Sequence, residues 1–218
     1  MGGVTDSMIT SDFHVETPRL PGHGTTIDDM LTTGWSDWTA EVTQAYSSLS
    51  QRVDRMVVVG QSMGATLALW AAIEHPEIAG LVCINPATRA RDAATMAMID
   101  DFIEDGILVV PGEGSDIADP EAHDISYAGT PLQPLRSLVC DGISTITERF
   151  GELTMPLRLF TSRQDHVVEP ADSEYLAATY GGPVEHSWLE RSFHVATRDY
   201  DRDFVTAETS AFVERVAR

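Results

Sequence analysis

The stretch "VVVGQSMGATLALWAA", residues 57–72, joins two kinds of local structure through a short turn. Its three valines form a β-branched apolar run that is typical of a strand covered on both faces. The alanine-rich segment after Gly64 favours a helix. The turn has the spacing G-x-S-x-G, and we expect small residues at Gly60 and Gly64 because side chains there would collide as the chain reverses. The sequence therefore predicts a strand, a tight turn and a helix in succession.

The serine of this turn is the first candidate for chemistry. Ser62 is expected to be exposed at the carboxyl end of the strand, beside a helix N-terminus that favours developing negative charge. We predict that Ser62 is a nucleophile in an elbow shaped by Gly60, Gln61 and Gly64, and the alternative is a turn serine with a structural role only. A serine hydroxyl is a poor nucleophile at neutral pH, so it needs a base and a group that orients the base.

Two polar residues that follow later strand-like runs fit these requirements. His194 lies in "ERSFHVATRDYDRD", after the last run, and Asp165 lies in "SRQDHVVEP", after the run before it. Both are predicted to lie at the carboxyl ends of strands, where open α/β sheets build their sites. We predict His194 as the base and Asp165 as the orienting acid. The alternatives are His166 and His186 for the base and Asp199 and Asp201 for the acid.

Apolar runs of strand length alternate with helix-length segments along most of the chain. This alternation predicts an α/β fold in which a mostly parallel sheet is covered by helices on both faces. The predicted strands are 13–20, 54–60, 78–86, 155–162 and 184–190, and the predicted helices are 35–52, 63–74, 171–180 and 202–217.

Residues 87–135 interrupt the alternation. A stretch rich in Gly, Pro and Asp follows Met96, Met98, Ile99, Phe102 and Ile103, which recur at helical spacing. A long segment of this kind inside a compact domain is usually a lid, a binding loop or a disordered insertion. The apolar residues fit a helix that lines a pocket and equally an ordinary amphipathic face.

Composition excludes several classes of protein. The 34 acidic residues outnumber 14 basic residues, all of them arginine, and a net charge of −20 disfavours binding to nucleic acids or anionic membranes. The sequence shows no apolar run long enough to span a membrane, no signal peptide and no metal motif. Cys83 and Cys140 are expected to be buried thiols. We therefore expect a cytoplasmic protein without a metal or stable membrane insertion.

Five motifs follow one another along the chain: "RLPGHG" (19–24), "GWSDW" (34–38), Gly60-Gln61-Ser62-Met63-Gly64, "SRQDHVVEP" (162–170) and "SFHVATRD" (192–199). Together they resemble the α/β-hydrolase superfamily, and within it the bacterial carboxylesterase and monoacylglycerol lipase group. The likeness covers about residues 15–86 and 135–217, and the chain order Ser, Asp, His is that of the family.

The resemblance implies a role for each residue of the candidate site. Ser62 would attack an ester carbonyl, His194 would take its proton, and Asp165 would hold the imidazole. The backbone N–H of Met63 would supply one donor of the oxyanion hole. The resemblance also implies a hydrolase core formed by residues 1–86 and 136–218, with residues 87–135 as a cap over the pocket.

The N-terminal region departs from the family pattern. Members usually begin with a strand that ends in an H-G-F-x-G-like loop, which gives the second oxyanion donor. No apolar strand precedes Gly2-Gly3 here, so we expect an N-terminally shortened fold that lacks this strand and loop. The N–H of Val4 in "GGVTDSM" is the candidate replacement.

The function implied is a serine carboxylic-ester hydrolase, like an esterase or monoacylglycerol lipase. It would act without a cofactor, through an acyl-enzyme, on small-molecule esters with small to medium acyl groups. Two alternatives stay open because a fold does not fix its chemistry. One is another hydrolase or acyl-transfer reaction on the same fold. The other is a catalytically impaired or silent relative that binds a small apolar ligand.

Overall fold

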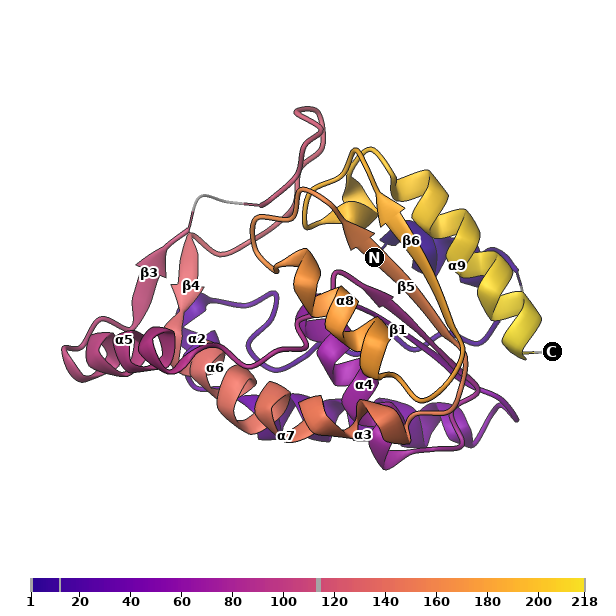
Figure 1. Ribbon diagram of the computed structural model, residues 1–218, viewed down its shortest axis with the longest axis horizontal. Helices are drawn as coiled ribbons and strands as arrows, with labels where there is room; N and C mark the ends of the chain where they lie inside the picture. Colours follow the sequence, from indigo (N-terminus) through magenta and orange to yellow (C-terminus); the bar gives the residue numbers. More distant parts are fainter. Residues whose placement is uncertain (1, 12, 113–114, 218) are drawn as a thin grey trace.

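The central element of the computed structural model is a four-stranded parallel sheet with the strand order β1-β2-β5-β6 (Figure 1). The structure describes residues 2–11, 13–112 and 115–217. Four of the predicted strands are confirmed within one to three residues of their expected ends. They are β1 (Val57–Gln61), β2 (Gly80–Ile84), β5 (Leu157–Ser162) and β6 (Val184–Leu189).

The strand predicted over residues 13–20 is wrong. This segment has no regular secondary structure, and its burial alternates only over its first four residues. Phe13 and Val15 are half-buried, whereas His14 and Glu16 are exposed. A strand-like run of residues is therefore not sufficient, because a strand also needs a neighbour whose backbone pairs with it.

The register of the sheet brings four strand ends to one edge. Gln61 pairs with Ile84, Ile84 with Phe160, and Ser162 with Leu189. Since all three pairings are parallel, the residues that follow β1, β2, β5 and β6 emerge along the same edge. Ser62, Asp165 and His194 follow β1, β5 and β6, respectively, at this edge.

Helices cover both faces of the sheet, as predicted. Alternate residues of the strands pack against α4 (Met63–Glu74) and α8 (Pro170–Thr179) on one face, with Leu69 and Leu176 in that core. The other residues of the strands, including Val82 and Phe160, pack with Phe212 of α9 (Arg202–Ala217) on the other face. Figure 1 shows α9 on one side of the strands and α8 on the other.

The predicted helices agree closely with the structure, and several helices were not predicted. The predicted segments correspond to α3 (Trp35–Ser50), α4 (Met63–Glu74), α8 (Pro170–Thr179) and α9 (Arg202–Ala217). Apart from α5 (Ala93–Glu104), which lies in the segment 87–135, the others are α1 (Gly2–Thr10), α2 (Ile27–Met30), α6 (Leu132–Ser137), the π-helix η1 (Leu138–Ile143), α7 (Ser144–Ile146), and the 3₁₀-helices η2 (Thr147–Glu152) and η3 (Ala196–Arg198).

The N-terminal helix α1 packs against α9. Val4 and Met8 are buried in this contact, and the hydroxyls of Ser7 and Ser210 lie 2.8 Å apart. The sequence did not predict α1 because its glycines and β-branched residues have low intrinsic helix propensity. Tertiary packing therefore determines this helix.

The segment 87–135 holds its own small elements apart from the main sheet. It contains α5 (Ala93–Glu104) and a two-stranded antiparallel sheet of β3 (Val109–Pro111) and β4 (Gly129–Pro131), seen at the left of Figure 1. The hydroxyl of Tyr127 donates to the carbonyl oxygen of Gly22 at 2.6 Å, so the segment is attached to the "RLPGHG" loop. Its predicted end at residue 135 falls inside α6.

The two cysteines differ in burial. Cys83 lies in the middle of β2, and burial raises the pKa of its thiol to about 12. Cys140 is half-buried, so the expectation of two buried thiols is wrong for this residue. Among the described residues, no helix combines the length and apolar character needed to cross a membrane.

Candidate active site

The turn between β1 and α4 places Ser62 in a strained backbone conformation. Its φ and ψ are 54° and −124°, a left-handed φ that is unusual for a residue with a side chain. The N–H of Ser62 donates to the carbonyl oxygen of Ile84 at 2.9 Å, which fixes the turn to the end of β2. The carbonyl oxygen of Ser62 accepts from the N–H of Ala65 at 2.9 Å and so begins α4.

The two glycines of the turn are not equivalent. A Cβ atom on Gly60 would lie 2.1 Å from the carbonyl oxygen of Gly64, so only glycine fits at position 60. A Cβ atom on Gly64 would have no neighbour within 4 Å. The expected collision is therefore correct for Gly60 and wrong for Gly64, because the crowding comes from the backbone of α4 closing over the end of β1.

The first turn of α4 begins directly after Ser62. Met63 is the first residue of the helix, and the N–H of a first helical residue has no partner within the helix, whereas the N–H of Ala65 donates to Ser62. Next to it, the side-chain oxygen of Gln61 accepts from the hydroxyl of Thr197 at 2.8 Å. This bond joins the elbow to η3, which follows His194.

Asp165 and His194 lie together in a nearly water-free contact. The Nδ1 atom of His194 is 2.7 Å from Oδ2 of Asp165, and the two side chains are 9% and 2% exposed. The other carboxylate oxygen of Asp165 accepts from the N–H groups of Val167 and Val168 at 2.9 and 2.8 Å. Because these two bonds fix the carboxylate, it can hold the imidazole in one orientation and one tautomer.

Asn85 connects the elbow to the histidine. This buried residue follows β2 with a φ of 46°, and its Nδ2 atom donates to the carbonyl oxygen of His194 at 2.8 Å. Since Ser62 is bonded to Ile84, two consecutive residues hold the predicted nucleophile and the predicted base. No hydrogen bond joins the hydroxyl of Ser62 to His194 in the part of the chain that the structure describes, and such bonds often form only with substrate present. Sequence reasoning missed Asn85, although an asparagine at the end of the apolar run "GLVCIN" was a usable signal.

The alternative acids support the loop that carries His194. Asp199 is fully buried, and its carboxylate accepts from the N–H groups of Phe193 and Tyr200 at 2.8 and 2.7 Å. Asp201 accepts from the N–H and the hydroxyl of Ser192 at 3.0 and 2.9 Å. Neither carboxylate contacts the His194 ring, so of the three predicted acids the structure brings only Asp165 to it.

The alternative bases lie elsewhere. His186 on β6 is hydrogen-bonded to the hydroxyl of Thr161 at 2.8 Å, and burial lowers the pKa of its imidazole. The side chain of His166 is 60% exposed and contacts Asp116 rather than Asp165. Val4, the candidate second donor, is buried in the first turn of α1, and its role stays a prediction.

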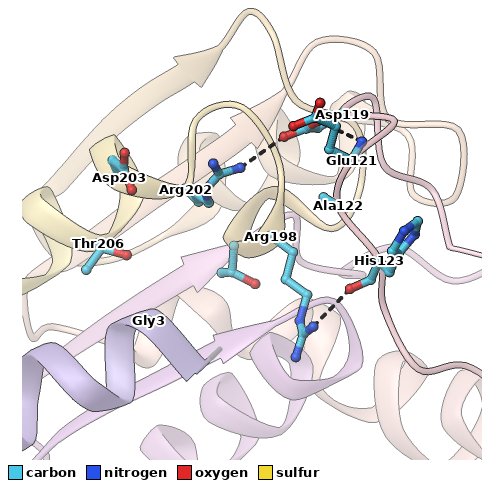
Figure 2. A pocket seen from close by; sticks show the side chains of 10 residues that line it. Gly3, Asp119, Glu121, Ala122, His123, Arg198, Arg202, Asp203 and Thr206 are labelled. Carbon is cyan, nitrogen blue, oxygen red and sulfur yellow. Dashed lines mark hydrogen bonds and ion pairs between the residues drawn. The ribbon is translucent and has the colours of Figure 1, made fainter.

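A polar cavity of about 470 Å³ lies beside the His194 loop (Figure 2). Figure 2 shows Arg202 paired with Asp119 at 3.1 Å and Arg198 donating to the carbonyl oxygen of His123 at 2.9 Å. The lining residues are Gly3, Asp119, Glu121, Ala122, His123, Thr197, Arg198, Arg202, Asp203 and Thr206. None of the predicted catalytic residues lines this cavity. Across the described ranges, no group of three or more His, Cys, Asp or Glu side chains is arranged to hold a metal ion.

Comparison with known proteins gives consistent relatives. A profile of the Alpha/beta hydrolase family matches residues 7–207. A thermostable monoacylglycerol lipase from Bacillus sp. (strain H-257) is 32% identical, over all of this chain and 86% of that protein. A carboxylesterase from Bacillus subtilis (strain 168) is 23% identical, over 91% of this chain and 80% of that protein. A solved structure, described in a study of the metagenome-derived lipolytic enzymes LipS and LipT, superposes with a TM-score of 0.90 and 34% identity over 97% of this chain and 86% of that one.

Proposed function

The chain belongs to the alpha/beta hydrolase family, and on this premise we propose that it hydrolyses carboxylic esters through a serine-bound acyl-enzyme. Its relatives support an ester hydrolase at the coarser level, since they include a monoacylglycerol lipase and a carboxylesterase. The observation that carries the serine mechanism is the buried Asp165–His194 hydrogen bond at the sheet edge where Ser62 takes its strained conformation.

The geometry supports one assignment of roles. His194 donates its Nδ1 proton to Asp165, so its Nε2 atom is left to accept the proton of Ser62. The Ser62 oxygen then bonds to the ester carbonyl carbon, and the imidazolium passes its proton to the alcohol that leaves. Water attacks the acyl-enzyme by the same proton path and releases the carboxylic acid and the free Ser62.

The negative charge of the tetrahedral intermediate needs hydrogen-bond donors. The N–H of Met63, at the positive end of α4, is our first donor, and the N–H of Val4 remains the candidate for the second. One donor of this kind contributes roughly two to three orders of magnitude to turnover. The second donor therefore decides how fast the enzyme is, rather than whether it reacts.

Residues 87–135 form the cap in this proposal. The segment is attached to the "RLPGHG" loop through Tyr127 and carries α5, on which the Met98 side chain is half exposed. A cap at this place would choose the acyl or alcohol group and exclude water from the reaction. We propose small to medium acyl esters, including monoacylglycerols, as the substrate class.

The test uses p-nitrophenyl esters of graded acyl length together with monoacylglycerols. We expect turnover by the wild type and by Ser50→Ala, which changes an exposed serine at the end of α3. Ser62→Ala should lower kcat by about 10⁴-fold to 10⁶-fold, as the loss of a nucleophile does in other serine hydrolases. A fluorophosphonate should label the wild type at Ser62 only.

Two results would redirect the proposal. Labelling of Ser62 without ester turnover would favour another reaction on the same fold. A wild type that neither turns over esters nor reacts with the fluorophosphonate would identify a silent relative that binds a ligand.

A further inference from the structure

Asp116 lies in the irregular part of residues 87–135, which we call the insertion. It contacts both the loop that carries Asp165 and the loop that carries His194. Its Oδ2 atom accepts from the N–H groups of His194 and His166, each at 3.1 Å. Its Oδ1 atom is 2.8 Å from Nδ1 of His166, and its carbonyl oxygen accepts from the N–H of Val195 at 3.0 Å. The Asp116 side chain is only 16% exposed. One residue of the insertion thus has four polar contacts with the two loops.

These contacts bracket the Asp165–His194 pair. His166 directly follows Asp165, so the Asp116 carboxylate is bonded to the backbone of His194 on one side and to the backbone next to Asp165 on the other. The side-chain bond between Asp165 and His194 joins the same two loops. A displacement of either loop would therefore change both the Asp116 contacts and the catalytic pair.

The backbone N–H groups around His194 donate to oxygens of aspartate residues rather than to a helix or a strand. Three consecutive N–H groups, those of Phe193, His194 and Val195, donate to Asp199, to the Asp116 carboxylate and to the Asp116 carbonyl oxygen, respectively. An irregular loop has no ladder of backbone bonds, and a buried N–H without an acceptor costs about 1–3 kcal/mol. Asp116 therefore accepts two of these three N–H groups, while the carbonyl oxygens of Phe193 and His194 accept from Ser162 and Asn85.

The insertion is fixed in return. The Asp199 carboxylate accepts from the N–H groups of Ala118 and Asp119 at 2.8 and 3.0 Å. Further along, Arg202 and Arg198 make the contacts with Asp119 and His123 that Figure 2 shows. Because the segment after Asp116 is bonded at several points, its carboxylate is presented to His194 in a defined place.

We infer that Asp116 is a positioning residue that holds the His194 backbone and the Asp165 loop in the arrangement needed for proton transfer. The inference rests on the proposed function, since it assigns the insertion a part in catalysis beyond covering the pocket. A misplacement of about 1 Å can cost roughly 10²-fold in rate. We expect Asp116→Ala to lower kcat by about 10-fold to 100-fold, and KM to change by less than about 3-fold.

Asp116→Asn separates positioning from a general structural role. The amide oxygen can take the place of Oδ2 and accept from both backbone N–H groups, while the amide nitrogen faces Nδ1 of His166, which can accept. This variant should keep kcat within about 3-fold of the wild type. The matched controls are Asp101→Ala and Asp101→Asn, which change an exposed acid on α5 of the same insertion and should leave kcat unchanged.

A readout without turnover keeps the inference separate from the proposed function. The Nδ1 proton of His194 in its bond to Asp165 should give a strongly downfield ¹H NMR signal in the wild type, assigned by its loss in His194→Ala. We expect the signal to broaden or disappear in Asp116→Ala and to persist in Asp116→Asn and in both Asp101 variants.

The outcomes are distinct. If the wild type hydrolyses esters and Asp116→Ala keeps both the signal and kcat, the inference is overturned and the proposed function stands. If the wild type is inactive but the signal disappears in Asp116→Ala alone, the positioning role stands and the proposed function fails. Equal losses of kcat in Asp116→Ala and Asp116→Asn would also overturn the inference, because the backbone acceptor would then not explain the effect.

Discussion

The elbow at residues 60–64 and the loop at residues 190–201 reach a defined geometry by different means. The elbow is mainly local: Gly60 admits the backbone of α4 and Ser62 adopts its strained φ within five consecutive residues, and one backbone bond from Ser62 to Ile84 fixes the turn to β2. The loop has only the short η3 as regular structure, and carboxylates from three parts of the chain hold it. Asp116 comes from the insertion, Asp165 follows β5, and Asp199 belongs to the loop itself.

Steric constraints determine the geometry of the elbow, whereas hydrogen bonds to carboxylates determine that of the loop. Close backbone packing, which leaves no room for a Cβ atom at Gly60, shapes the elbow, and such a steric constraint is insensitive to pH and salt. Carboxylates that accept from backbone N–H groups fix the loop, so its stability depends on charge and on contacts distant in sequence. Substitutions in the two regions should therefore fail in different ways.

The largest effect is expected at Gly60. In Gly60→Ala the new methyl group would lie 2.1 Å from the carbonyl oxygen of Gly64, and the β1–α4 junction would have to open. We expect the free energy of unfolding to fall by at least about 4 kcal/mol and fluorophosphonate labelling of Ser62 to be lost. Urea denaturation and labelling measure the two effects.

Gly64→Ala is the matched control for the elbow. Its methyl group has open space within the first turn of α4, and alanine is favoured over glycine in a helix by about 0.5–1 kcal/mol. This variant should be as stable as the wild type or more so, with labelling retained. Equal damage from both substitutions would contradict the steric account of the elbow.

An intermediate effect is expected at Asp199 in the loop. Each of its carboxylate oxygens accepts from two backbone N–H groups, so the amide nitrogen in Asp199→Asn must face two donors. We expect the free energy of unfolding to fall by about 3 kcal/mol, more than in Asp116→Asn, where one of the facing groups is a histidine nitrogen. Denaturation of both variants beside Asp101→Asn checks the order, and an Asp199→Asn protein as stable as Asp101→Asn would remove the polar account of the loop.

The smallest expected effect is the change with pH of the stability that Asp116 contributes. Burial alone would raise the pKa of Asp116, but the bonds from His166 and His194 outweigh it and lower the pKa of the carboxyl. The stability that Asp116 contributes is then present above its unfolded pKa of about 4 and is lost as the pH falls through the lowered folded value. The difference in unfolding free energy between the wild type and Asp116→Asn should therefore shrink below about pH 4.

The stability contributed by Asp172 should change with pH in the opposite direction to that of Asp116. Burial raises the pKa of this carboxyl despite the N–H donors of Thr88 and Arg89. Its contribution is complete below about pH 4 and is lost as the pH rises through the raised folded value. Urea denaturation at pH 3, 4, 5 and 7 should show the Asp116→Asn and Asp172→Asn differences moving in opposite directions, and parallel curves would contradict both signs.

The same contrast explains what could be predicted from the sequence. Four strands, four helices and the elbow follow from patterns within about twenty residues, and they were predicted nearly to their ends. The prediction of a strand over residues 13–20 failed because a local run of residues does not show whether a neighbouring strand is there to pair with it. The predicted collision at Gly64 was wrong because the G-x-S-x-G spacing treats both glycines alike, whereas only a Cβ atom on Gly60 would meet the backbone of α4.

The support of the His194 loop could not be predicted from a single sequence. Asp116 lies in "GEGSDIADP", where nothing local distinguishes it from its acidic neighbours, and it meets His194 across 78 residues. Asn85 could have been predicted from the sequence, because it directly follows the buried run of β2 and a buried side-chain amide needs hydrogen-bond partners. Its partner in the structure is the carbonyl oxygen of His194. Contacts of this kind need the tertiary structure.

The bonds of Asp116 also bear on how this enzyme can be redesigned. An exchange of residues 87–135 for the corresponding segment of another hydrolase would ordinarily be planned as a graft of substrate preference onto an unchanged catalytic core. Here the graft would remove the acceptor of the His194 and His166 backbone donors at the same time. A chimera that retains the "SDIAD" segment, residues 115–119, would separate the effect on substrate preference from the effect on the His194 loop. Without that segment, the insertion and the core should be exchanged together.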